Sequence, residues 1–562
     1  MSVPVGRFLP ALLPLVLLTA CGGSSSSSNP DVQITLQAQF QKQILTPSGF
    51  NGITTLPARY CYAEIYDATS NNLVASGYLG STGTGTASVP RGLQVYAQVY
   101  ADYQVPSADP SSPFLHGEVL NAPLPATYTT SSAFQATPEW SVTSNTIPAD
   151  QDGTLTITAL NDSTRIAGAF NIADQAVTFG AAIRDMDGTG TLRLPDLATY
   201  WTTSTQPNDQ TRTYPAVTLA SASTLLLAAD GRAVFSHQVE GLATGAPNTE
   251  TDEWDDGVLQ ETFAHLLFAD DSYKPDGSSA LSLLRRDNDN VYVSRTTPSE
   301  STVAFVGGFC DFLAGATRNQ SQLLDSYVDA SGISQVEDFD LSSHSMVPTA
   351  DKGEFTRGSI AVSLWGIWQN ELGGTASGLQ TLWAAIESNT ALPDGTGEYN
   401  GATLGCYPSY LLGVQSRVSA PTWNAVLNEL SLESVPAPTS TYFNSTALWQ
   451  TVPVPFSGSG ALQTYDPSQF RYYDWDQSQA YRFTQGASGT RTITMNPTGG
   501  QDFYLELIGP GGWVAGSYDS ALAGQPRTLT VPNLAPGVYA VRVRASREDT
   551  ATGTYGYALS IN

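Results

Sequence analysis

The segment 252–267, with the sequence DEWDDGVLQETFAHLL, has the pattern of an amphipathic helix that begins with acidic residues. Its apolar residues recur at helical spacing along one stripe, at Val258, Leu259, Phe263, Leu266 and Leu267. Asp255 and Asp256 stand where the positive end of a helix dipole favours negative charge. Glu261 and His265 are four residues apart and therefore share a helix face. We predict a helix from Trp254 to Ala269 that presents one carboxylate and one imidazole together.

The regions far from this helix have the two-residue period of β-strands. Residues 31–165 contain alternating segments such as 32–40 and 93–100, which is typical of half-buried strands. Residues 466–562 contain short apolar segments at regular spacing, separated by turns rich in Gly and Pro. We therefore predict a β-sandwich at each end of the chain.

The middle region, residues 166–435, has mixed periodicity and predicts a domain of helices and strands. Besides the helix at 254–269, we expect helices at 167–177, 303–316, 358–372, 379–388 and 422–431. Residues 436–465, which begin with Pro436 and Pro438, are a predicted linker. At 562 residues the chain is too long for one core, so the expected fold class is multidomain α+β.

Several landmarks occur in a fixed order along the middle region. They are AFNI at 169–172, LPDLATYW at 194–201, DEWDD at 252–256, VGGFCDFLA at 306–314, and GEF to SLW at 353–365. With these landmarks the region resembles the thermolysin-type zinc metallopeptidases that bacteria secrete. The resemblance implies a zinc helix, which in that family carries His-Glu-x-x-His.

The residues of this chain depart from the zinc motif at three of its four positions. By the resemblance, Glu261 stands at the first imidazole, Thr262 at the general base and His265 at the second imidazole. The third ligand, a Glu in such families, falls at Gly307. A hydrolytic zinc site needs three protein ligands, an open position and a base, and the base alone contributes roughly 10²–10⁴ in rate. We therefore predict a degenerate domain with no catalytic residue and no metal ligand.

The alternative is a remodelled zinc site, because Glu261 and His265 could still bind one cation from their shared face. The ionisable residues that could complete such a site are His237, His344 and Glu300. On the leading hypothesis the chain has no cofactor, and His265 is a half-buried, hydrogen-bonded histidine.

The two predicted sandwiches also resemble known modules. Residues 31–165 resemble the transthyretin-like or regulatory-like modules of secreted peptidases. The C-terminal landmarks are DWD at 474–476, YRF at 481–483, DFYL at 502–505 and Pro536-Gly537 before a strand. With them residues 466–562 resemble the pre-peptidase C-terminal domain, some of whose members bind calcium, so calcium is a possible ligand here.

The N-terminus predicts a lipoprotein. Residues 1–20 have a basic start and a short apolar run, as in a signal peptide, and LTAC at 18–21 has the form of a lipobox. Cleavage before Cys21 would allow that residue to be acylated and to anchor the protein by its acyl chains. Residues 21–30 form a Ser-rich tether. The expected location is the bacterial cell envelope, at the outer membrane or cell surface; an ordinary secretory signal is the alternative.

The net charge limits the classes of macromolecule that the chain can bind, and the cysteines limit the disulfides that it can form. The formal charge of −27, from 24 basic and 51 acidic residues, argues against binding to nucleic acid. In an oxidising compartment a disulfide between Cys310 and Cys406 is plausible, with Cys61 a buried thiol, although three pairings are possible. No later segment is expected to span a membrane.

Three functions are compatible with these features. The first is a cell-envelope lipoprotein whose degenerate metallopeptidase-like domain binds or scaffolds extracytoplasmic peptides or proteins. The second is an active secreted zinc metallohydrolase that uses Glu261 and His265. The third is a purely structural envelope protein whose sandwiches make all the contacts.

Overall fold

The computed structural model describes residues 17–20, 30–107, 113–121, 138–187, 194, 197–201, 233–235, 252–269, 295–296, 298, 301–328, 334–387, 407–438, 449–463, 478–509, 512–517, 524–545 and 553–562. The chain forms two compact units, Met1–Phe263 with Leu323–Phe339, and Ala264–Gln322 with Asp340–Asn562. This division differs from the predicted boundary after residue 165, because the helix that follows belongs to the first unit. The fold is nevertheless multidomain α+β with β-sandwich regions, as the sequence predicts.

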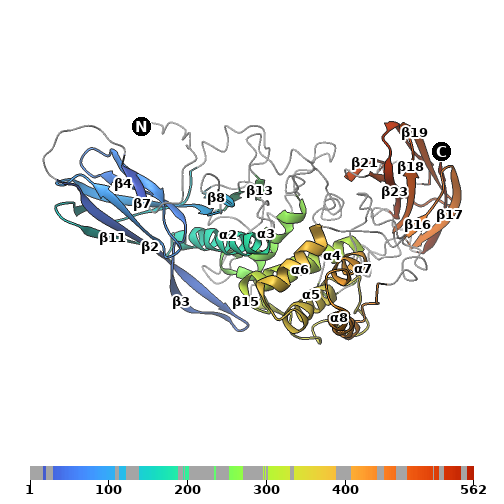
Figure 1. Ribbon diagram of the computed structural model, residues 1–562, viewed down its shortest axis with the longest axis horizontal. Helices are drawn as coiled ribbons and strands as arrows, with labels where there is room; N and C mark the ends of the chain where they lie inside the picture. Colours follow the sequence, from blue (N-terminus) through green and yellow to red (C-terminus); the bar gives the residue numbers. More distant parts are fainter. Residues whose placement is uncertain are drawn as a thin grey trace. The chain divides into compact units, whose positions relative to one another are not determined.

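The first unit is built on an extended sheet (Figure 1). Its strands are β1 (Leu17–Ala20), β2 (Val32–Thr46), β3 (Gly49–Pro57), β4 (Cys61–Asp67), β5 (Leu73–Tyr78), β6 (Thr84–Val89), β7 (Gln94–Val105), β8 (Leu115–Leu120), β9 (Ser141–Thr143), β10 (Ile147–Pro148), β11 (Gly153–Ala159), β12 (Leu197–Tyr200) and β13 (Ala233–Phe235). Their order is β11-β2-β6-β1-β5-β4-β7-β8-β12-β13, with β3 beside β2, and β9 and β10 beside β7.

Strand β1 lies within the predicted signal peptide and links two parts of this sheet. It pairs in parallel with β6 and antiparallel with β5. Without β1, the order separates into β11-β2-β6 and β5-β4-β7-β8-β12-β13, which is the two-sheet arrangement of a sandwich. Removal of residues 1–20 by the expected processing would therefore leave two sheets rather than one.

Strand alternation creates the core of the first unit. Residues Ile34 and Leu36 of β2 are buried in one cluster with Ile65 of β4 and Val99 of β7, so both parts of the sheet share a core. Cys61 lies in the same cluster as a free thiol, as the sequence predicts. Burial raises the pKa of this thiol well above its usual value, so the group stays protonated and unreactive.

Helix α2 (Ile166–Met186) packs against this sheet. A Cβ at Gly180 would lie 2.7 Å from Leu115 Cδ2, so glycine allows the helix to approach β8 closely. Arg59 Nε donates to Asp174 Oδ1 at 2.6 Å and ties the helix to the segment before β4. By length and composition α2 could cross a membrane, contrary to expectation, but 78% of its most apolar window is buried inside the protein.

A short 3-10 turn, η3 (Asp252–Trp254), leads into α3 (Asp256–Ala269), and the hairpin β14 (Gln322–Val328) and β15 (Ser334–Asp340) follows α4. The other helices are α4 (Ser301–Arg318), α5 (Arg357–Gly366), the π-helical turn η6 (Ile367–Glu371), α6 (Ala376–Glu387), α7 (Tyr407–Gln415) and α8 (Ala420–Leu432). The predicted helices are thus present. The sequence did not predict helix α7 or the paired strands β14 and β15. A Cβ at Gly308 would lie 2.7 Å from Ile360 Cβ, so α4 and α5 cross at close range.

The C-terminal part is a β-sandwich of two sheets, drawn in orange and red in Figure 1. One sheet is β16-β18-β23-β20-β21 and the other is β17-β24-β19-β22. Their bounds are β16 (Trp449–Thr451), β17 (Phe456–Gln463), β18 (Ser478–Gln485), β19 (Gly489–Pro497), β20 (Phe503–Gly509), β21 (Gly512–Ser517), β22 (Arg527–Leu534), β23 (Gly537–Ala545) and β24 (Thr554–Ile561).

This sandwich begins before the predicted boundary at residue 466. Strands β16 and β17 fall within the predicted linker, and β17 pairs with β24 along its whole length. The linker prediction rests on the composition of the segment that begins at Pro436 and Pro438. The pairing with a strand about a hundred residues later cannot be read from that composition.

Replacement of Leu507, a fully buried residue of β20, by Ala should lower the free energy of unfolding of the sandwich by about 2–5 kcal/mol, because it leaves a cavity. Urea unfolding followed by circular dichroism measures the change. Thr530→Ala, at an exposed position of β22, is the control and should change stability by about 0.5 kcal/mol or less. Equal effects of the two variants would contradict this description of the core.

Candidate functional site

The acidic residues before α3 bind groups of the protein itself. Glu253 is fully buried, and its carboxylate pairs with the guanidinium of Arg165. Asn171 Nδ2 of α2 donates to the backbone carbonyl of Glu253 at 2.6 Å. Asp256 pairs with Lys42 of β2. These contacts fix the start of α3 against the first unit, so the predicted helix is confirmed and its acidic lead-in has a structural role.

Asp255 has a similar role at the N-terminus of α3. Its backbone carbonyl accepts from the N–H of Leu259, in the first turn of the helix. Its buried carboxylate accepts from the backbone N–H of Ser326 at 2.6 Å and from the Ser326 hydroxyl at 2.8 and 2.9 Å. These two donors, the backbone N–H and the hydroxyl shared between both carboxylate oxygens, attach the helix to β14.

Two of the motif positions on α3 are half-buried. Glu261 and Thr262 both lie on the helix, and the Thr262 hydroxyl donates to the Val258 carbonyl at 2.7 Å. A hydroxyl with an ordinary alcohol pKa cannot replace a carboxylate as general base at neutral pH. His265 belongs to α3, but its side chain lies outside the described residues, so the predicted Glu261–His265 pair stays a prediction.

The fourth motif position, Gly307, is buried in α4 beneath Arg357. A Cβ at Gly307 would lie 2.8 Å from Arg357 Cδ and 3.1 Å from Arg357 Nε. The Arg357 guanidinium donates to both carboxylate oxygens of Asp311, at 2.6 and 2.8 Å. Arg295 Nε donates to the same carboxylate at 3.1 Å. A buried cluster of two cations and one anion therefore lies where the resemblance would place a zinc ligand.

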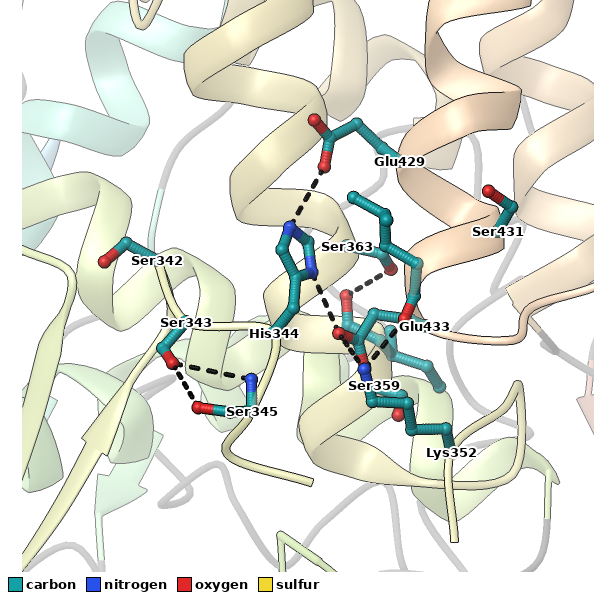
Figure 2. Close-up of polar contacts among 12 residues, drawn as sticks. Ser342, Ser343, His344, Ser345, Lys352, Ser359, Ser363, Glu429, Ser431 and Glu433 are labelled. Carbon is teal, nitrogen blue, oxygen red and sulfur yellow. Dashed lines mark hydrogen bonds and ion pairs between the residues drawn. The ribbon is translucent and has the colours of Figure 1, made fainter. Parts of the chain in front are cut away.

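His344 is the described member of the three residues proposed to complete a remodelled site. Its Nδ1 lies 2.9 Å from Glu433 Oε1, and its Nε2 lies 3.6 Å from Glu429 Oε2; Glu429 belongs to α8 and Glu433 directly follows that helix (Figure 2). Lys352 Nζ donates to Glu433 Oε1 at 3.1 Å. Burial and the charge of Glu429 raise the pKa of Glu371 nearby.

A histidine bonded to a carboxylate supplies two of the three members of a hydrolase triad. Here Nε2 of His344 faces Glu429, and the nearby Ser343 and Ser345 hydroxyls lie 2.9 Å from each other (Figure 2). The described contacts of His344 therefore belong to a cluster of one imidazole, one ammonium group and two carboxylates. Among these described contacts, no serine hydroxyl is hydrogen-bonded to the imidazole as a nucleophile would be.

A cluster that the sequence analysis missed lies on β7 and β8. The residues Asp102, His116 and Glu118 are 5%, 7% and 8% exposed, and one possible ligand atom from each lies within 4.8 Å of the others. Asp102 Oδ1 lies 3.2 Å from His116 Nε2 and accepts from the Tyr78 hydroxyl at 3.0 Å. Burial and the adjacent Asp102 charge raise the pKa of Tyr78 well above its usual value, so Tyr78 remains a neutral donor.

One local signal could have pointed to this cluster. His116 and Glu118 are two residues apart in β8, so they share a face of the sheet. Gly117 between them lies too close to the Tyr103 ring and to the Leu197 carbonyl for any side chain. Asp102 joins them through the β7–β8 register, which the sequence does not state.

The structure does not test the predictions for the remaining candidate residues. Cys21, His237, Glu300 and Cys406 lie outside the described residues. Cys310 is buried in α4, so its pairing with Cys406 stays a prediction.

Comparison with known proteins gives limited similarities. No protein-family model and no curated protein matches the chain. Among solved structures, the pre-peptidase C-terminal domain of a collagenase from Bacillus anthracis is 17% identical, with 20% of this chain and 94% of that chain covered and a TM-score of 0.16. PliG, a periplasmic inhibitor of g-type lysozyme, matches from Aeromonas hydrophila (18% identity, 20% and 97% covered, TM-score 0.14) and from Salmonella Typhimurium (21%, 20% and 99%, 0.14). The collagenase domain belongs to the family that residues 466–562 resemble, and these similarities carry no statement about activity.

Replacement of Arg357 by Met should destabilise the second unit by about 3–5 kcal/mol, because it removes the bidentate partner of the buried Asp311 carboxylate. Arg417→Met, at an exposed position of the same unit, is the matched control and should cost about 1 kcal/mol or less. Thermal and urea unfolding of the full chain measure both variants. Indistinguishable stabilities would show that the cluster over Gly307 contributes little.

Proposed function

We propose that the chain is a cell-envelope lipoprotein whose metallopeptidase-like middle region binds or scaffolds a peptide or protein without hydrolysing it. The observation that carries the proposal is the cluster over Gly307. The resemblance implies a Glu ligand for zinc at this position, and the guanidinium of Arg357 lies there instead. A fixed positive charge there opposes a divalent cation.

The contacts of α3 support the same proposal. Glu253 and Asp255, which resemble the lead-in to a zinc helix, are each bonded to protein groups. Thr262 replaces the general base, which removes roughly 10²–10⁴ of rate even where a metal is held. The middle region therefore has a helix where the resemblance places the zinc helix, but Thr262 and Gly307 stand at the positions of the general base and the third ligand.

Envelope anchoring rests on the N-terminal sequence. The lipobox at 18–21 and the Ser-rich tether after it would hold the folded units near a membrane surface through acyl chains. The net charge of −27 suits an extracytoplasmic peptide or protein as the partner better than a nucleic acid.

The peptidase question is tested by incubating the full chain with zinc and fluorescent casein. We expect no hydrolysis above the buffer rate, because the base and the third ligand are both replaced. The variants His265→Ala and His344→Ala are compared with the unmodified chain. Casein cleavage that His265→Ala abolishes would contradict the proposal and support the remodelled zinc site, and loss of cleavage in His344→Ala as well would add His344 to that site.

Lipid anchoring is tested by expression in a Gram-negative host and fractionation. The unmodified chain should be found in the membrane fraction with the mass of a diacylated Cys21 after loss of residues 1–20. Cys21→Ser should abolish the acyl mass and move the protein to the aqueous fraction. Cys61→Ala, at a buried thiol, is the control and should keep the lipid. An unmodified chain cleaved without acylation would indicate an ordinary secretory signal.

A further inference from the structure

Strands β7 and β8 bring three metal-ligating side chains to one face of the first unit's sheet. The antiparallel register pairs Asp102 with Glu118 directly, and Gln104 with His116. His116 and Glu118 are two residues apart and share a face, so His116 is the diagonal neighbour of Asp102. Backbone pairing thus sets the positions of all three groups.

The distances suit a single ion. Donors bound to one zinc or manganese ion at about 2.0–2.4 Å lie no more than about 4–5 Å apart. The ligand atoms of Asp102, His116 and Glu118 all lie within 4.8 Å of one another, and the Asp102 and His116 atoms are 3.2 Å apart. Small rotations of the side chains would bring all three donors to one ion.

Electrostatics favours a cation at this point. Like charges directly opposite each other on adjacent strands destabilise a sheet, and Asp102 faces Glu118 in a region where both are more than nine-tenths buried. Burial raises the cost of holding two carboxylates close together. A divalent cation would neutralise both carboxylates, and a neutral imidazole is a good third ligand for it.

Tyr78 contacts two of the three candidate ligands and would hold them in position, as hydrogen-bonding neighbours of metal ligands do. Its hydroxyl donates to Asp102 Oδ1 at 3.0 Å. Its ring meets the His116 ring edge-on, with centroids 6.4 Å apart and planes at 88°. Groups that orient metal ligands in this way contribute roughly 10–100-fold to metal affinity.

We propose that Asp102, His116 and Glu118 bind one divalent transition-metal cation, with zinc or manganese best matched to one imidazole and two carboxylates. The site joins β7 to β8 and is separate from the positions on α3 and α4. It departs from the metal-free chain that the sequence predicts, and it is independent of the proposed function.

The test uses the full chain, purified with a tag that contains no histidine and freed of metal with EDTA. Zinc and, separately, manganese are titrated by calorimetry, and bound metal is counted by mass spectrometry. We expect one equivalent of at least one of these metals and a rise in melting temperature on binding. His116→Gln should weaken binding by at least about 100-fold, and Tyr78→Phe by roughly 10–100-fold. His344→Gln and His265→Gln are the matched histidine controls and should bind normally.

A further variant distinguishes loss of metal binding from loss of the folded structure. Glu118→Gln keeps the size of the side chain and removes one of two facing carboxylates, and circular dichroism of the metal-free variant should show the fold of the unmodified chain. The same variant should lose the rise on metal addition. A chain that binds neither metal at millimolar concentration would overturn the proposal. Binding that His265→Gln abolishes and His116→Gln leaves intact would also overturn it and assign the metal to α3.

Discussion

The pairing of buried carboxylates with a few basic side chains is the constraint on which this structure depends. The chain has 51 acidic residues against 24 basic ones, and an unpaired charge in a protein interior is costly. The described pairs are spread over the whole chain: Arg165 with Glu253, Arg295 and Arg357 with Asp311, Lys352 with Glu433, Arg527 with Asp502, and Arg542 with Glu506. Each joins two segments that are distant in sequence.

This constraint explains how a segment that resembles a zinc helix can serve a structural purpose. In the first unit, Glu253 and Asp255 hold the start of α3 against α2 and β14. In the second unit, Asp311 fixes Arg357 over Gly307. On β7 and β8 the side chain beside the buried carboxylate of Asp102 is an imidazole rather than a guanidinium. That difference is why a cation is proposed at Asp102 and not at Gly307.

Much of the fold could be predicted because it rests on local periodicity. Helix α3 and strand β2 were found from apolar spacing and alternation, and Cys61 was correctly placed in a core. The strands β16 and β17 are absent from the sequence-based prediction, because β16 is only three residues long, β17 contains two glycines, and their pairing partners are distant in sequence. The cluster around Asp102 was missed for a related reason. Periodicity places His116 and Glu118 on one face, but only the register of β7 with β8 adds Asp102.

The most direct test of the account is anomalous diffraction at the zinc edge from crystals of the full chain grown with zinc, because it locates the metal without reference to activity. The account predicts a peak within bonding distance of Asp102, His116 and Glu118, with the side chain of Arg357 paired to Asp311 over Gly307. A zinc peak between Glu261 and His265 on α3, with no peak between β7 and β8, would contradict it.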